Sequence, residues 1–121
     1  MSYSIATLLT RNLQEVFGEN DSARRRAAVQ ELYTEDGAFD DPSKGVYRGR
    51  DEIDRIAGEI RATNLDSRYQ QIAEPEETGN GGRAPWVPGR PGEAPAYAGT
   101  DFIIARAGRI AALYLFFDKL P

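Results

Sequence analysis

Asp41 is the residue whose type and position best suit chemistry in this chain. It lies in the run 32–42, directly before Pro42, on what reads as a short β-strand. Because alternate side chains of a strand share a face, Asp41 is predicted to lie on the same side as Phe39, toward the apolar interior. A carboxylate in an apolar pocket loses hydration, becomes more basic and can move a proton beside a carbonyl group. The chemistry indicated is proton transfer, as in an isomerase, lyase or cyclase.

The same position has two other interpretations. An aspartate before a proline at a strand end often fixes a turn by accepting backbone N–H bonds, or pairs with a nearby arginine, here Arg48 or Arg50. Asp41 is also suited to a polar contact with a bound ligand. The residues alone leave the structural, binding and catalytic roles open.

The amino-acid composition limits which side chains could take part in catalysis or metal binding. The chain contains no cysteine and no histidine, which excludes disulfides, thiolate and imidazole metal ligands, and Ser–His or Cys–His nucleophile pairs. No spacing of carboxylates matches a metal site. We therefore expect neither a metal nor a cofactor, and proton transfer must use Asp, Glu, Tyr, Lys or water.

Length and charge indicate the broad class. The 121 residues have the size of one domain, 1–121, and the net charge of −4 argues against a nucleic-acid surface. No apolar stretch reaches the roughly 18 residues of a membrane span, and the first residues lack the basic region of a signal peptide. We expect a cytoplasmic protein without nucleic-acid or membrane partners.

Three helices are predicted in the first half of the chain. Apolar residues recur at three- and four-residue spacing over 4–17, before Gly18. Asn20 or Asp21 can cap a second helix, with an apolar stripe that reaches Tyr33. A third helix is expected after Gly49.

The second half is predicted to be extended. Residues 69–73 alternate weakly, and 96–105 and 110–117 are strong strands joined by 106–109. Alanine is poor at a positive φ, so a type I turn with Gly108 in the left-handed position is expected there. The segment 74–95, rich in proline and glycine, reads as a strand end, a turn near 79–82, a short edge strand carrying Trp86, and an irregular return.

Both faces of the last two strands are apolar. The predicted face sets are Ala98, Thr100, Phe102 and Ile104 against Tyr97, Asp101 and Ile103 in the first strand, and Leu113, Leu115 and Phe117 against Tyr114 and Phe116 in the second. One face must cover helices or line a pocket. The other is predicted to form a symmetric homodimer through Tyr97, Ile103, Tyr114 and Phe116; the alternative is that Tyr114 and Phe116 are half-exposed aromatics.

Two segments together resemble a known family. The run 32–42, continued by 47–53, and the ending 99–104, 108–110 and 115–118 are similar to the SnoaL-like branch of the nuclear transport factor 2-like superfamily. The resemblance implies a cystatin-like α+β cone-shaped barrel, with N-terminal helices packed in the concave face of a curved antiparallel sheet and a pocket at the open end. The superfamily includes ketosteroid isomerase-like enzymes, polyketide cyclases, dehydratases and proteins that only bind, so the fold does not decide the activity.

The resemblance carries over to individual residues unevenly. In ketosteroid isomerases the aspartate before the proline of the first strand is the general base, which matches Asp41. The position of their protonated acid is Thr100 here, and Leu13, Gln14 and Phe17 occupy the region of their tyrosine, so both oxyanion donors of that family are missing. Other side chains that could substitute as donors are Tyr33, Tyr69, Tyr97 and Thr100.

Two other branches of the superfamily place their catalytic aspartates on later strands. Polyketide cyclases use an aspartate on a later strand, for which Asp101 is the nearby candidate. Because side chains alternate between the two faces of a strand, Asp101 is expected on the other face unless a bulge shifts the register. Limonene epoxide hydrolases need an inward aspartate where this chain has 113–115, and that branch is set aside.

The sequence thus predicts a single α+β domain with a pocket. Its expected lining is Phe17, Tyr33, Phe39, Asp41, Tyr69, Trp86, Thr100, Phe102, Leu115 and Phe117. The leading hypothesis is binding of a small, largely apolar organic ligand, without a specific activity. The alternatives are an isomerase, lyase or cyclase in which Asp41 shuttles a proton, and a structural dimerisation module with a vestigial cavity.

Overall fold

The computed structural model describes residues 2–90 and 92–118. In chain order the elements are α1 (Ile5–Arg11), the π-helical segment η1 (Asn12–Phe17), α2 (Ser22–Leu32), β1 (Tyr33–Asp41), β2 (Gly45–Arg48), α3 (Arg50–Ala62), β3 (Arg68–Gln71), β4 (Glu76–Thr78), β5 (Gly81–Gly89), β6 (Ala98–Arg106) and β7 (Arg109–Asp118). None of the helices in these ranges is long and apolar enough to cross a membrane.

The helices begin and end near the predicted residues. α1 continues directly into η1, so the first helix covers 5–17, and the Ser4 side chain caps it by accepting from Thr7 N. Asp21 caps α2 by accepting from the N–H groups of Ala23 and Arg24 at 2.9 and 3.0 Å. α2 ends at Leu32, so Tyr33, predicted on the helix, is instead the first residue of β1.

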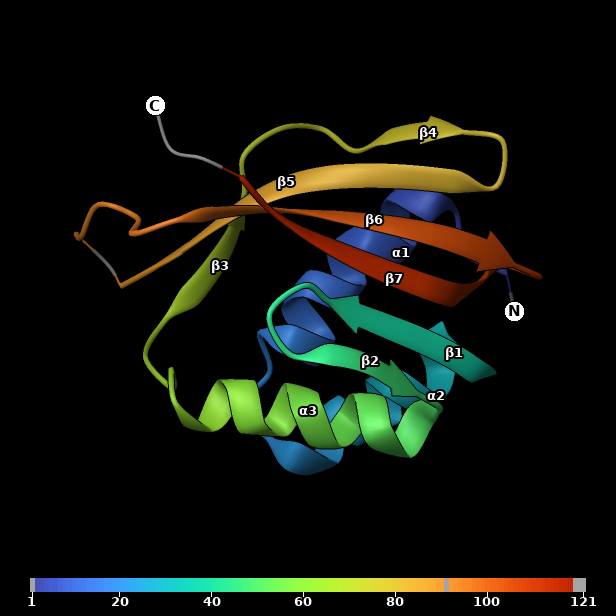
Figure 1. The fold of residues 1–121 in the computed structure, drawn as a ribbon, viewed down its shortest axis with the longest axis horizontal. Coiled ribbons are helices and arrows are strands. Elements are labelled where there is room, and N and C mark those ends of the chain that lie inside the picture. Colours follow the sequence, from blue (N-terminus) through green and yellow to red (C-terminus); the bar gives the residue numbers. More distant parts are fainter. Residues whose placement is uncertain (1, 91, 119–121) are drawn as a thin grey trace.

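One mixed sheet holds all the strands in the order β2-β1-β7-β6-β5-β3, with β4 also paired to β5. β1 and β7 run parallel, and the other pairs are antiparallel. The prediction of an α+β cone is confirmed, although the sheet is not wholly antiparallel. Figure 1 shows α1 behind β6 and β7, and α3 alongside β1 and β2. Their apolar side chains form one core that includes Leu8, Phe17, Phe39, Ile53 and Leu113.

Trp86 lies on an interior strand, so the predicted edge strand is wrong. β5 pairs with β6 on one side and with β4 and β3 on the other. On that second side, β4 pairs with 81–83 and β3 with 86–89, so Pro85 falls between the two partner strands. A residue without an N–H is tolerated in such a gap, which is how a proline-containing segment occupies the middle of the sheet.

The β6–β7 turn also differs from the prediction. Ala107 and Gly108 have φ of 53° and 72°, and they connect the paired residues Arg106 and Arg109. This is a two-residue turn with both central residues at positive φ, not a type I turn. Its twist matches that of the flanking strands, which outweighs the cost of a left-handed alanine.

A bulge follows this turn and changes the predicted faces of β6. Ala105 pairs with Ile110 but Ile104 pairs with Ala112, so Ala111 is an extra residue in β7. Beyond it, Asp101 is opposite Leu115, and Ile103 is opposite Leu113. Asp101 and Ile103 therefore face inward, and the predicted assignment of β6 is reversed.

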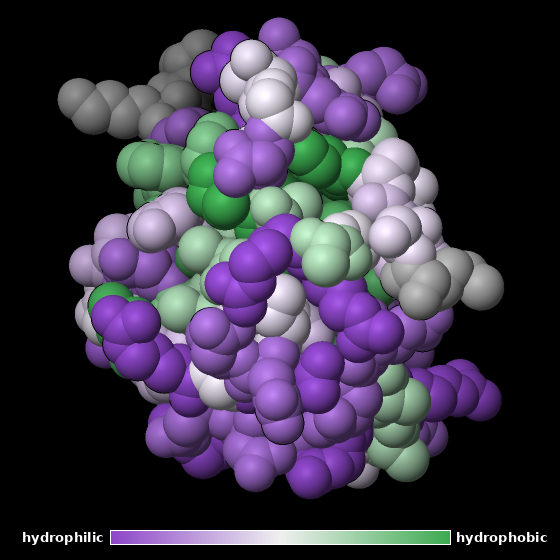
Figure 2. Space-filling model, turned by 90° about the vertical axis from the view of Figure 1, so that its right-hand side faces the viewer, coloured by the Kyte–Doolittle hydropathy of each residue, from purple (hydrophilic) through white to green (hydrophobic). Residues whose placement is uncertain are grey.

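The outer face of the hairpin is apolar, but its membership is corrected. Phe102 packs against Tyr114 with ring centroids 6.4 Å apart, and Tyr114 and Phe116 are 40% and 56% exposed. Ile103 is fully buried and cannot belong to an outer interface. Figure 2 shows apolar residues gathered in a band on one side of the molecule, between hydrophilic residues at the top and a hydrophilic lower half. The homodimer stays a prediction, with Ile103 removed from its face.

The strained turn gives a test of the fold. Ala107→Gly is expected to stabilise the protein by about 0.5–1 kcal/mol, because relief of a left-handed alanine exceeds the added entropy of an unfolded glycine. Urea unfolding of both proteins measures this difference.

The matched control is Ala112→Gly, since Ala107 alone among the described non-glycine residues has a positive φ. Placed within a strand, this substitution should destabilise by about 0.5–1 kcal/mol. Equal destabilisation by the two changes would show that Ala107 is not strained.

Candidate functional site

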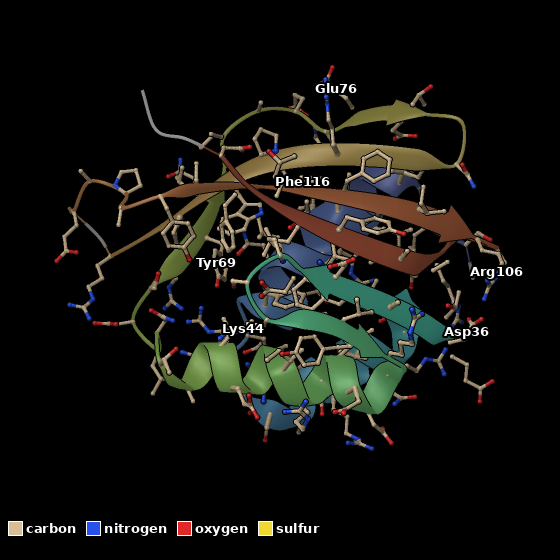
Figure 3. All side chains as sticks on the ribbon, viewed as in Figure 1. Asp36, Lys44, Tyr69, Glu76, Arg106 and Phe116 are labelled. Atoms are coloured by element: carbon tan, nitrogen blue, oxygen red, sulfur yellow. The ribbon has the colours of Figure 1, made fainter. Side chains whose placement is uncertain are left out.

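The concave side of the sheet holds a cavity of about 390 Å³, at the lower end of the size range of small-molecule sites. Its wall is mainly apolar and aromatic, with several polar groups. The lining consists of Leu13, Phe17, Phe39, Asp41, Ser43, Lys44, Ile56, Glu59, Ile60, Thr63, Asn64, Tyr69, Trp86, Tyr97, Asp101, Leu113, Leu115 and Phe117. Figure 3 shows Tyr69 and Lys44 at the same end of the molecule, between the strands and α3.

Most of the residues predicted to line a pocket meet at this cavity. The structure brings together Phe17, Phe39, Asp41, Tyr69, Trp86, Leu115 and Phe117. Their role in binding or catalysis stays a prediction.

Three predicted lining residues lie elsewhere. The Tyr33 side chain is fully buried in the core, where its hydroxyl donates to Asn12 Oδ1 at 2.6 Å. Phe102 lies on the outer face, and the Thr100 hydroxyl bonds an Asp118 carboxylate oxygen at 2.6 Å. The bulge in β7 removes Thr100 and Phe102 from the pocket, because it turns their neighbours inward.

Asp41 has the turn role that its sequence position allows. Its side chain is buried, and its Oδ1 accepts from both the N–H and the hydroxyl of Ser43 at 2.8 Å. The predicted partner Arg50 instead donates to the Tyr33 carbonyl oxygen at 2.7 and 3.0 Å. This turn fixes the carboxylate at the end of β1, beside the cavity.

Asp101 is the polar group that the sequence assigned to the wrong face. It is 6% exposed and lines the cavity from β6, and no described residue makes a hydrogen bond of ordinary geometry to its carboxyl group. Burial raises its pKa from 3.8 to about 7, and the nearby Trp86 indole opposes that rise only in part. The Trp86 N–H is itself buried without a well-formed bond. Asp101 can therefore gain or lose a proton near neutral pH.

Four aromatic rings form a continuous strip along the cavity, which we call the aromatic wall: Tyr69, Trp86, Tyr97 and Phe117. Successive ring centroids are 5.0, 6.0 and 5.8 Å apart, each pair in edge-to-face geometry. Tyr97, predicted on the outer face, thus belongs to the cavity, which removes it, like Ile103, from the predicted homodimer face. Burial raises the pKa of Tyr69 to about 12, so this phenol stays neutral in the physiological range.

The second aromatic pair is Phe17 and Phe39, whose ring centroids are 5.1 Å apart. Both side chains belong to the core and to the cavity lining. Core packing therefore holds this part of the cavity lining in place.

No cluster of three carboxylate, histidine or cysteine side chains suited to a metal ion occurs in 2–90 and 92–118.

The buried carboxyl group makes stability depend on pH. The folded protein retains the Asp101 proton between pH 4 and 7, where the unfolded chain has lost it, so stability falls as pH rises through this range. From pH 5 to pH 8 this loss should amount to roughly 3 kcal/mol. Asp101→Asn, which does not titrate, should remove that part of the loss in urea unfolding at the two pH values.

Asp40→Asn is the matched control, because it makes the same substitution at a carboxylate outside the cavity lining. It should keep the wild-type pH dependence. An unchanged dependence in Asp101→Asn would show that Asp101 titrates normally.

Comparison with known proteins supports the fold. No protein-family profile and no curated protein sequence matches the chain. A candidate isomerase of the SnoaL-like family from Agrobacterium tumefaciens is 25% identical, with a TM-score of 0.87 over 95% of this chain and 97% of that chain.

Two more distant structures share the fold at lower identity. One is a candidate SnoaL-like polyketide cyclase from Jannaschia sp. CCS1, 13% identical, with a TM-score of 0.71 over 98% of this chain and 91% of that chain. The other is a hypothetical protein of ketosteroid isomerase-like fold from Catenulispora acidiphila, solved with trimethylamine. It is 14% identical, with a TM-score of 0.75 over 95% of this chain and 88% of that chain.

Proposed function

We propose that this chain, which has the fold of the SnoaL-like branch of the nuclear transport factor 2-like superfamily, binds a small, largely apolar organic molecule in its cone. The observation that carries the proposal is Asp101, an almost fully buried carboxyl group that lines the cavity. The one side chain that lies close enough to donate to it among the described residues, the Trp86 indole, makes no well-formed bond.

Buried polar groups in folded proteins are nearly always satisfied, because an unmet one costs free energy. A bound molecule with one polar group would satisfy Asp101, and its apolar part would contact the aromatic wall. The open cavity also favours a ligand over a purely structural module with a vestigial cavity. The trimethylamine held by the Catenulispora structure supports occupation of this fold by a small organic molecule.

Ligand binding in the cavity can be followed by tryptophan fluorescence. Trp86 is the only tryptophan, so its fluorescence should shift when small alicyclic or aromatic molecules enter, and it should saturate with increasing ligand. Leu115→Asp, which places a charge on the apolar wall, should weaken binding of a neutral ligand at least tenfold. Tyr114→Ser, one residue away on the outer face, should not weaken it.

Absence of any saturable change across the ligand panel would contradict the binding proposal. Circular dichroism of each variant must first show the wild-type fold, so that a loss of binding reports on the cavity.

A second candidate function is proton transfer, and Asp101 is better suited to it than Asp41. A pKa near 7 suits a group that must both accept and donate a proton, whereas Asp41 Oδ1 is occupied by the Ser43 turn. An isomerase, lyase or cyclase reaction on a carbonyl compound would then use Asp101 as its acid and base.

Proton NMR in deuterated water tests this activity without knowledge of the substrate. Wild-type protein should exchange the α-hydrogens of cyclic ketones faster than buffer does. Asp101→Asn should lose at least a hundredfold in rate, which is the lower range for removal of a general base. If Asp41→Asn abolishes exchange while Asp101→Asn retains it, the assignment to Asp101 is wrong.

A further inference from the structure

We propose that the ligand of this cavity is a small organic cation, such as an alkylammonium ion, held against the aromatic wall with the Asp101 carboxylate as its counter-ion. The inference rests on the proposed binding function and gives it a chemical class. Three features of the cavity carry it: the rings, the balance of charge, and the position of the carboxylate among the rings.

The aromatic rings of the cavity are suited to binding a cation. The faces of aromatic rings attract cations within about 6 Å of the ring centroid, and several rings around one site recognise alkylated ammonium groups. The aromatic wall supplies four rings in an unbroken series, with centroids 5.0 to 6.0 Å apart. One of these rings already has a cation beside it: Arg61 Cζ lies 5.8 Å from the Tyr69 centroid. Arg61 is itself buried outside the cavity lining.

The charge balance of the lining favours a positive ligand. Its charged side chains are Asp41, Asp101, Glu59 and Lys44. Lys44 and Glu59 belong to exposed residues, whereas the two aspartates are 3% and 6% exposed. Buried charge is thus carboxylate alone among the described lining residues. An anionic ligand would be repelled, and a neutral one would leave an ionised Asp101 without a counter-charge.

The carboxylate and the wall meet at the inner end of the cavity. Trp86 is 5% exposed, and its strand β5 pairs with β6 at Ala84–Asp101 and Trp86–Gly99. The Trp86 indole is close enough to Asp101 to influence its ionisation. Tyr97 and Phe117 are 40% and 48% exposed, so the wall runs from this inner end to the mouth. A cation could therefore contact a ring and the carboxylate at once.

Binding should depend on pH through Asp101. The other titratable or charged groups around it are Tyr33, Tyr69, Tyr97, Asp41, Lys44, Glu59 and, beside the Tyr69 ring, the buried Arg61. Burial raises the pKa values of the three tyrosines above the ordinary value, so they stay neutral between pH 6 and 8. With the pKa of Asp101 at about 7, a ligand that requires its carboxylate should bind about tenfold more weakly at pH 6 than at pH 8.

The experiment compares two molecules of the same shape. Choline carries a permanent positive charge, and 3,3-dimethylbutan-1-ol replaces its nitrogen with carbon. Calorimetric titration at pH 8 should show choline binding at least tenfold more tightly than the alcohol. The affinity for choline should fall about tenfold at pH 6, and that for the alcohol should not fall.

Two variants separate the carboxylate from general effects. Asp101→Asn should weaken choline binding at pH 8 at least tenfold, and it should weaken binding of the alcohol by a much smaller factor. Asp40→Asn makes the same change outside the lining and should alter neither affinity. Circular dichroism confirms the fold of each variant.

The outcomes distinguish the two proposals. If the alcohol binds as tightly as choline, or if binding strengthens at pH 6, the cation proposal is overturned and the binding function stands. If neither molecule binds and the wider ligand panel also gives no saturable fluorescence change, both proposals fail.

Discussion

The unpaired residue Ala111 determines which side chains of β6 enter the cone. The two-residue turn pairs Arg106 with Arg109, and an unbroken ladder would continue by placing Phe102 opposite Leu113, and Thr100 opposite Leu115. The bulge at Ala111 advances β7 by one residue, so the observed partners are Ile103 and Asp101. Because side chains alternate along a strand, this single shift exchanges the two faces of β6 relative to β7. The burial of the Asp101 carboxyl group depends on this shift.

The bulge also explains how both ends of β7 contribute to the interior. Ile110 and Leu113 are both buried, although residues three apart on a regular strand point to opposite faces. The extra residue lets Ile110 pack in the core and Leu113, Leu115 and Phe117 line the cavity. The same shift places the Asp101 side chain in apolar surroundings, which destabilise its charged form. The surrounding core must offset that cost, as is common where a fold holds a functional group.

Local features were predictable from the sequence, and features that depend on distant pairing were not. The helix over 5–17, the Asp21 cap and the inward face of Leu113, Leu115 and Phe117 follow from spacing within one element. The bulge has no such signal, since Ala111 resembles any other strand residue, and without it the predicted face of β6 would have been correct. The segment that carries Trp86 was predicted as an edge strand because it contains prolines. In the structure, Pro85 lies in the gap between the two strands that pair in succession with β5, and such pairing has no local sequence signal.

The same distinction explains the change of emphasis from Asp41 to Asp101. The partners of Asp41 are its own neighbours in sequence, and the turn that follows it satisfies one carboxylate oxygen through Ser43. The environment of Asp101 is assembled from β3, β5, β6 and β7, whose aromatic and apolar side chains line the same cavity. A carboxylate bonded within its own turn has little need of a ligand. A carboxyl group that is buried by distant strands, with only the Trp86 indole to oppose the rise in its pKa, gains more from a bound molecule. For that reason we interpret the cavity around Asp101.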